Sequence, residues 1–151
     1  MAEVKSTQMT SVAAGSKLLP SADGGRERLF YAEYLAPAST QAVSDTIYLG
    51  DIPKGARICH NWIGNISTGT ASCTLDVGFR SKATGTVIDV DGIAAAVAVT
   101  TAGAVTFNNG SSLTAGLSYV TTEVVEVYAT IRTAVLAASQ KLIFEGSYVQ
   151  D

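Results

Sequence analysis

The hydrophobic and polar positions of the chain alternate with a period of two in several short segments. In residues 72–80 the side chains of Cys73, Leu75, Val77 and Phe79 fall on one face, and polar or small residues fall on the other. Alternation of this length is typical of a β-strand with one buried face. The segment therefore predicts a half-buried strand.

Similar segments recur along the chain and are separated by turn-forming residues. Residues 56–63 carry apolar groups on both faces, which predicts a strand packed on two sides, and residues 92–104 fit either a buried strand or a short helix. Pro53 and Gly55 mark a turn. The predicted strands are residues 28–35, 46–49, 56–63, 72–80, 86–90, 105–107, 122–131 and 141–148. About eight short antiparallel strands with frequent turns predict an all-β chain, folded as a β-sandwich or jelly roll.

Residues 1–25 differ in composition from the segment that follows them. They contain no aromatic side chain, and Gly15 and Pro20 interrupt any helix. A segment of this composition buries too little apolar surface to fold alone. We therefore divide the chain into an extended N-terminal arm, residues 1–25, and a β-sandwich body, residues 26–151. A plain disordered terminus is the alternative interpretation of the arm.

The chain is poor in charge. Charged residues make up 15% of it, against about 25% in a typical soluble domain. So few charges predict that copies of the chain or a partner protein cover part of its surface, and a weakly charged monomer is the alternative. The ten Lys and Arg residues are scattered and the net charge is −3, which argues against nucleic-acid binding. No stretch is apolar enough for a signal peptide or a membrane span, so we expect a protein that is made in a cytoplasm and does not enter a membrane.

The histidine and the two cysteines offer little for catalysis or metal binding. His60 is the only histidine, and no nucleophile motif lies near it in the sequence. Together with Cys59 and Cys73 it does not complete the usual four-ligand zinc pattern. The cysteines are expected to be free thiols. Residues 65–71 look like a hairpin connection, so a disulfide between paired strands is possible but not implied.

Two pairs of carboxylates stand close together in the sequence. Asp89 and Asp91 begin like a calcium-binding loop, but no further oxygen ligands follow, which favours a tight turn at Asp91 and Gly92. Glu123 and Glu126 point to opposite faces of a strand, so they do not form the local carboxylate pair of a glycosidase. We therefore predict no enzyme activity, no cofactor and no metal site.

The aromatic side chains provide one further candidate site. In a jelly-roll module they could line a sugar-binding surface, although aromatic residues mark protein interfaces equally well. They are Tyr31, Tyr34, Tyr48, Trp62, Tyr119, Tyr128 and Tyr148.

Four stretches of the chain resemble capsid decoration (cement) proteins of tailed bacteriophages, which have a jelly-roll body. They are IYLGDIPKGARI, TASCTLDVGFRSKATGTVIDVDGIAAA, YVTTEVVEVYATI and KLIFEGSYV, and they fall within residues 45–149. The resemblance implies that copies of the chain, as dimers or trimers, sit on a capsid surface, contact the major capsid protein and reinforce the shell. It also implies that there is no active site.

The residues and the resemblance together favour a non-enzymatic virion protein that binds the outside of a phage capsid and staples neighbouring major capsid protein subunits. In this hypothesis the arm gains order on the partner surface, and its candidate partner-binding residues are Val12, Leu18, Leu19 and Pro20. The alternatives are a carbohydrate-binding jelly-roll module and a tail or baseplate component. Neither nucleic acid nor a membrane is an expected partner.

Overall fold

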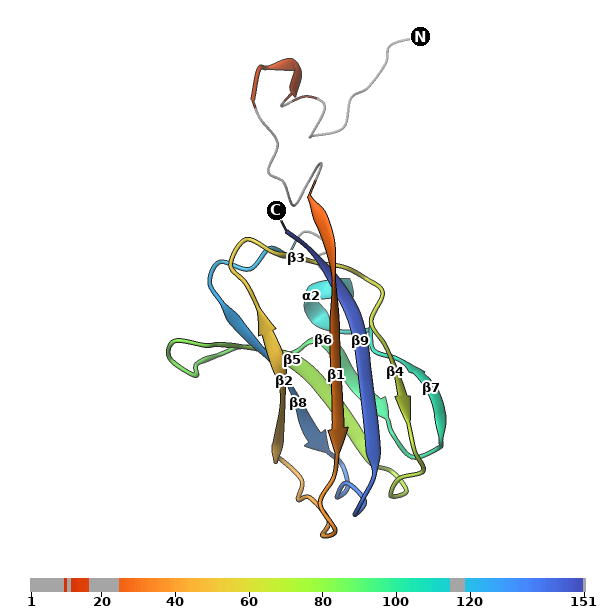
Figure 1. Cartoon of the computed structure of the whole chain (residues 1–151). Helices are drawn as coiled ribbons and strands as arrows, with labels where there is room; N and C mark the ends of the chain where they lie inside the picture. The colour runs from red at the N-terminus through yellow and green to blue at the C-terminus, as the bar shows by residue number, and fades with distance from the viewer. Residues whose placement is uncertain (1–9, 11, 17–24, 115–118, 151) are drawn as a thin grey trace.

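Two antiparallel sheets face each other in the body of the molecule (Figure 1). The computed structural model describes residues 10, 12–16, 25–114 and 119–150. One sheet has the strand order β1-β9-β4-β7, with β3 also paired to β9, and the other has the order β2-β8-β5-β6. The elements are β1 (Arg26–Leu35), β2 (Thr46–Ile52), β3 (Arg57–Ile58), β4 (Ile63–Ile66), β5 (Thr74–Ser81), β6 (Val87–Ala98), β7 (Gly103–Thr106), α2 (Ser111–Thr114), β8 (Val125–Arg132) and β9 (Lys141–Gln150).

The strand pairs are nested inside one another. β1 pairs with β9, β2 with β8, β4 with β7 and β5 with β6, and every pair is antiparallel. The same pairing would result if one long hairpin, with its tip between β5 and β6, were rolled up. Successive strand pairs would then fall in alternate sheets. Such a roll is the jelly roll. The predicted all-β sandwich is therefore confirmed.

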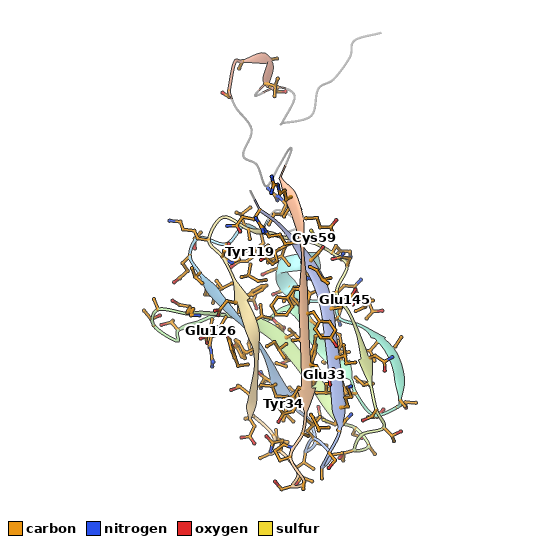
Figure 2. All side chains as sticks on the ribbon, in the orientation of Figure 1. Glu33, Tyr34, Cys59, Tyr119, Glu126 and Glu145 are labelled. Atoms are coloured by element: carbon orange, nitrogen blue, oxygen red, sulfur yellow. The ribbon has the colours of Figure 1, made fainter. Side chains whose placement is uncertain are left out.

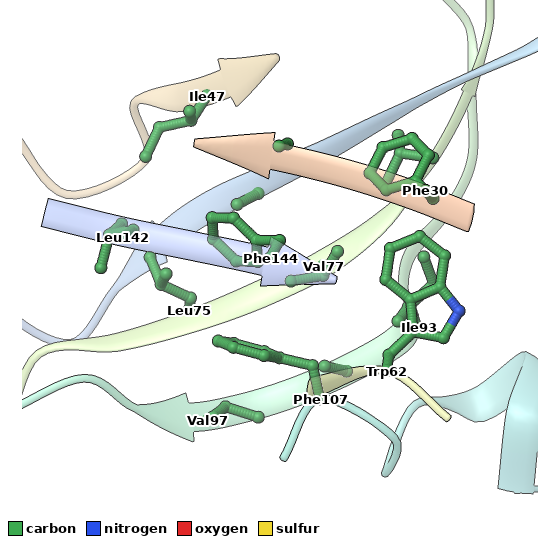
Figure 3. Close-up of a cluster of buried hydrophobic side chains, with 14 of the residues drawn as sticks. Phe30, Ile47, Trp62, Leu75, Val77, Ile93, Val97, Phe107, Leu142 and Phe144 are labelled. Atoms are coloured by element: carbon green, nitrogen blue, oxygen red, sulfur yellow. The ribbon is translucent and has the colours of Figure 1, made fainter. Parts of the chain in front are cut away.

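The core lies between the two sheets, where alternate side chains of each strand meet. The predicted inward face of residues 72–80 is confirmed, because its four apolar side chains are fully buried in and next to β5. Figure 3 shows the aromatic part of the core. The rings of Phe30 and Trp62 are 4.9 Å apart between centroids, and those of Phe107 and Phe144 are 5.1 Å apart. These tilted contacts add to the stabilisation that burial alone provides.

The strand predicted at residues 56–63 is interrupted. β3 and β4 both pair with β9, but residues 59–62 lie opposite only Gly146 and Ser147. The surplus residues form a bulge, which breaks the alternation that the sequence suggested. As a result His60 is exposed, although the residues two positions before and after it are buried.

Trp62, the last residue of the bulge, points into the core. Its ring lies against the backbone of Gly146, where an added Cβ would come within 2.3 Å of ring carbon Cδ2. The Oδ1 atom of Asn61 accepts the backbone N–H of Ser147 at 3.2 Å, which supplies a partner where the ladder is broken. Ile63 is 52% exposed, so this segment is packed on one side and not on two.

The turn predicted at Asp91 and Gly92 is wrong, because both residues lie inside β6. Residues 93–98, which fitted either a strand or a helix, continue this strand. The register between β5 and β6 shifts at several points, so β6 bends over its neighbour. At the bend an added Cβ on Gly78 would lie 2.1 Å from the carbonyl oxygen of Asp89, so only glycine fits there.

The connection between β4 and β5 crosses from one sheet to the other, so the predicted hairpin at residues 65–71 is wrong. Cys59 and Cys73 therefore do not lie on paired strands. Both cysteines are free thiols; Cys59 is partly exposed and Cys73 is buried.

Only a short part of the predicted arm is described. Residues 10 and 12–16 form a single exposed helical turn, in which the Ala14 N–H donates to the Thr10 carbonyl at 3.0 Å. Gly15 ends this turn with a φ of +81°, a conformation that favours glycine. None of the described helices has the length and apolar character that crossing a membrane requires. The division into arm and body stays a prediction.

Candidate functional site

The outer face of the β1-β9-β4-β7 sheet carries four large apolar side chains in exposed positions. Leu29, Leu35, Tyr31 and Ile63 are 68%, 64%, 54% and 52% exposed. Three of them alternate along β1 with side chains that point into the core, such as Phe30. We call this surface, made by the four exposed residues together with Ile143 and Glu145 of β9, the apolar face.

The strand register places these side chains next to one another. Glu145 on β9 stands directly between Tyr31 on β1 and Ile63 on β4. Directly opposed residues of antiparallel strands have Cβ atoms about 4.5–5.5 Å apart, close enough for their side chains to touch. Figure 2 labels Glu33 and Glu145, which lie on the neighbouring strands β1 and β9. Tyr31, Glu145 and Ile63 therefore form one row across the sheet.

Beside this row an ion pair crosses diagonally from β1 to β9. Lys141 Nζ is 2.9 Å from Glu33 Oε1, and the Tyr31 hydroxyl donates to Glu33 Oε2 at 3.2 Å. The hydrogen bond from Lys141 holds the pKa of Glu33 below its usual value, and Glu33 in turn raises the pKa of Lys141. Desolvation, followed by the hydrogen bond to Glu33, raises the pKa of Tyr31. Both members of the pair are exposed, so its contribution to stability is small.

The outer face of the other sheet differs, because its charges pair with one another. Arg80 Nε is 2.6 Å from Glu126 Oε2, and Arg132 Nε is 2.7 Å from Asp76 Oδ2, in both cases between β5 and β8. Asp76 also accepts the backbone N–H of Ala96 at 2.7 Å. A face whose charged groups already have partners gains little from a further partner.

The Asp89–Asp91 pair, a weak candidate for cation binding, lies on β6 beside α2. Asp89 Oδ2 accepts the hydroxyls of Ser111 at 2.6 Å and Ser112 at 3.0 Å. Burial opposes ionisation of Asp89, but the hydrogen bond from Ser111, followed by those from Asp91 and Ser112, lowers its pKa. Contact with Asp89, and then burial, raises the pKa of Asp91. Within the described part of the chain no three such side chains come together to hold a metal ion.

The other residues considered for catalysis lie in separate surroundings. His60 is exposed in the bulge between β3 and β4. Glu123 accepts the hydroxyl of Ser81 at 2.5 Å, whereas Glu126 pairs with an arginine on the outer face of β5. The structure does not assemble these groups into one site.

The aromatic residues considered for sugar binding do not line one surface. Trp62 is fully buried, and Tyr128 is 3% exposed. Tyr119 stacks on a core phenylalanine. Of the exposed tyrosines, Tyr31 belongs to one sheet and Tyr48 to the other. An aromatic groove for a sugar is therefore not formed by these side chains.

Of the predicted partner-binding residues, only Val12 is described. Its side chain is 46% exposed in the helical turn. Leu18, Leu19 and Pro20 lie outside the described residues. Their role in binding stays a prediction.

Comparison with known proteins places the fold among phage capsid structures. No protein-family model matches the chain, and no curated protein sequence matches it. A chain in the capsid of Ralstonia phage GP4 aligns over 89% of this chain and 92% of its own length, with a TM-score of 0.63 and 18% identity. A chain in the capsid asymmetric unit of cyanophage Pam1 aligns over 84% and 86%, with a TM-score of 0.56 and 12% identity. A third, in the acid-stable capsid of Helicobacter pylori bacteriophage KHP30, aligns over 82% and 87%, with a TM-score of 0.50 and 18% identity. At these identities the similarity is one of fold.

Proposed function

We propose that this chain is a non-enzymatic virion protein that binds the outside of a phage capsid and staples neighbouring major capsid protein subunits. The observation that carries the proposal is the jelly roll, which aligns over 89% of the chain with a chain in the capsid of Ralstonia phage GP4. The similar folds in the capsids of a cyanophage and a Helicobacter pylori phage support the same role.

The body has the properties that a stapling protein needs. Its core is continuous between the two sheets, so the outer surfaces are held rigidly and a partner does not have to order them. Several weak contacts by symmetric copies, arranged as dimers or trimers, would add up through multivalency. The arm, with Val12, Leu18, Leu19 and Pro20, would supply an additional attachment that gains order on the partner.

The test is binding of the purified chain to capsid shells of the phage that encodes it, prepared without this protein. We expect the chain to co-sediment with the shells to saturation, and cryo-electron microscopy to show its density on the outer surface between capsid subunits. Removal of residues 1–25 should leave a folded body that binds more weakly. A chain that does not bind the shells would refute the proposal, and antibody labelling of the tail instead of the head would assign it to the tail or baseplate.

A further inference from the structure

One carboxylate in the middle of the apolar face has no partner among the described residues. Glu145 is exposed between Tyr31 and Ile63, and no hydrogen bond or ion pair joins it to any described residue. The other two carboxylates on the outward side of β1 have partners. Glu33 pairs with Lys141, and at the far end of β1 Glu27 accepts the hydroxyl of Ser147.

This arrangement limits what can cover the face. Burying Tyr31 and Ile63 against another protein would also remove Glu145 from water. A carboxylate that loses its water without gaining a partner costs several kcal/mol, so the covering surface has to supply a hydrogen-bond donor, and a cation is the strongest one. We propose that the apolar face binds the capsid, and that its occupant is an apolar patch of a capsid subunit with a lysine or arginine that pairs with Glu145. This inference rests on the proposed capsid function.

A second copy of this chain is a poorer occupant of the same face. Next to Glu145 the outward charged residues of this sheet are Glu33 and Lys141, which pair with each other, so Glu145 carries the unbalanced charge. Farther along the sheet, Glu27 and Arg57 share one row across β9. A symmetric contact places the same surface on both sides, so acid would meet acid. Like charges that face each other across an interface cost several kcal/mol, whereas a basic partner is attracted.

The opposite outer face also has exposed apolar side chains, on its edge strands β2 and β6, but its central charged groups have partners. Its arginines already pair with Glu126 and Asp76 across neighbouring strands. Tyr128, which lies between them, is 3% exposed, with the Arg80 guanidinium 5.2 Å from its ring centroid. We therefore assign the apolar face to the capsid and the ion-paired face to solvent.

The experiment measures binding of single variants of the full chain to the same capsid shells. Glu145→Lys should weaken binding by about 100-fold and the neutral isostere Glu145→Gln by about tenfold, because one repels the partner cation and the other only leaves it unpaired. Ile63→Asp should weaken binding by at least about tenfold, since it places a second carboxylate in the apolar patch. The matched control is Val87→Asp on β6, where a branched apolar side chain is 56% exposed at an edge of the other sheet. It should bind within about twofold of the unmodified chain, as residues outside an interface do.

Two further measurements distinguish loss of this contact from loss of the fold. All four substitutions are at exposed positions, so each variant should unfold at nearly the same temperature as the unmodified chain, which excludes misfolding as a cause. Added salt should weaken capsid binding by the unmodified chain more than binding by the Glu145→Gln variant, because only the unmodified chain has the proposed ion pair.

The possible failures are distinguishable. If the unmodified chain binds the shells and Glu145→Lys and Ile63→Asp bind equally well, the assignment of the face is overturned while the capsid function stands. If Ile63→Asp dissociates an oligomer of the chain without weakening capsid binding, the face is a contact between copies and the proposal is overturned. If the unmodified chain does not bind at all, the proposed function itself fails.

Discussion

The contact between Trp62 and Gly146 provides a sharp test of how the bulge is held. β9 is paired on both sides, with β1 along one edge and with β3 and β4 along the other, so its backbone has little room to move. The Trp62 ring is fully buried and packs against Phe30. An added Cβ on Gly146 would lie 2.3, 2.5 and 2.7 Å from three atoms of the indole ring, well inside van der Waals contact. Gly146→Ala therefore forces the ring or the strand to shift.

The expected cost follows from overpacking. Inserting one methyl group into a well-packed core typically costs about 1–3 kcal/mol, and a position with a fixed backbone on one side and a buried ring on the other belongs near the upper end. We expect a loss of about 2–3 kcal/mol in the free energy of unfolding. For a chain of this length that loss lowers the melting temperature by about 5–10 °C. Thermal unfolding followed by circular dichroism, together with urea titration, measures both quantities.

A double-mutant cycle ties the effect to this contact. Trp62→Phe removes part of the indole ring, along with an N–H that is buried without a hydrogen-bond partner among the described residues. In the Trp62→Phe background, Gly146→Ala should cost at least about 1 kcal/mol less than it does alone, because the smaller ring leaves room for the methyl group. Additive effects of the two substitutions, or a Gly146→Ala protein as stable as the unmodified chain, would refute the reasoning.

Three further outcomes test other parts of the fold. Asp91→Asn should stabilise the protein at neutral pH, because contact with Asp89 raises the pKa of Asp91 above 3.8 and its ionisation therefore destabilises the folded state as pH rises. The gain in the free energy of unfolding, measured by urea titration, should vanish below pH 3.8. An equal gain at both pH values would contradict the charge argument. Asp76→Ala should lower the free energy of unfolding by about 2 kcal/mol, since two donors lose their acceptor, and an unchanged urea midpoint would count against that. Cys59 should react with a thiol reagent before Cys73, whose burial shields it and raises its pKa, whereas equal rates would show that the second thiol is accessible.

The strands that the sequence predicted well send alternate apolar side chains into the shared core. The strands predicted at residues 72–80 and 122–131 are β5 and β8, which begin two and three residues after the predicted starts; their alternate apolar side chains enter the shared core, and both strands are central in one sheet. The bulges were not predictable in the same way. They depend on contacts between residues distant in sequence, such as Trp62 with Gly146, and on the carbonyl of Asp89 that approaches Gly78. Local alternation contains no information about such contacts.

The candidate site had a signal in the sequence that alternation alone could not interpret. Residues 28–35 look like a strand with poor alternation, because Leu29, Tyr31 and Leu35 interleave with the core residues Phe30 and Ala32. A pattern of this kind means that both faces are apolar. It cannot say whether the second face is covered by the chain itself or left open. The structure answers this, since the outward side chains of β1 are among the most exposed apolar groups described.

The distribution of charge links this open face to the low charge of the whole chain. Only 15% of the residues are charged, and on the β2-β8-β5-β6 face several of them pair with each other. On the apolar face, exposed Leu29, Tyr31 and Ile63 lie around Glu145. The Glu145 carboxylate forms no ion pair or hydrogen bond with any described residue. In a monomer that met only water, this arrangement would add exposed apolar area without a compensating gain. It becomes favourable when a partner covers the face and brings the missing cation, and for that reason we regard the apolar face and Glu145 as parts of one binding surface.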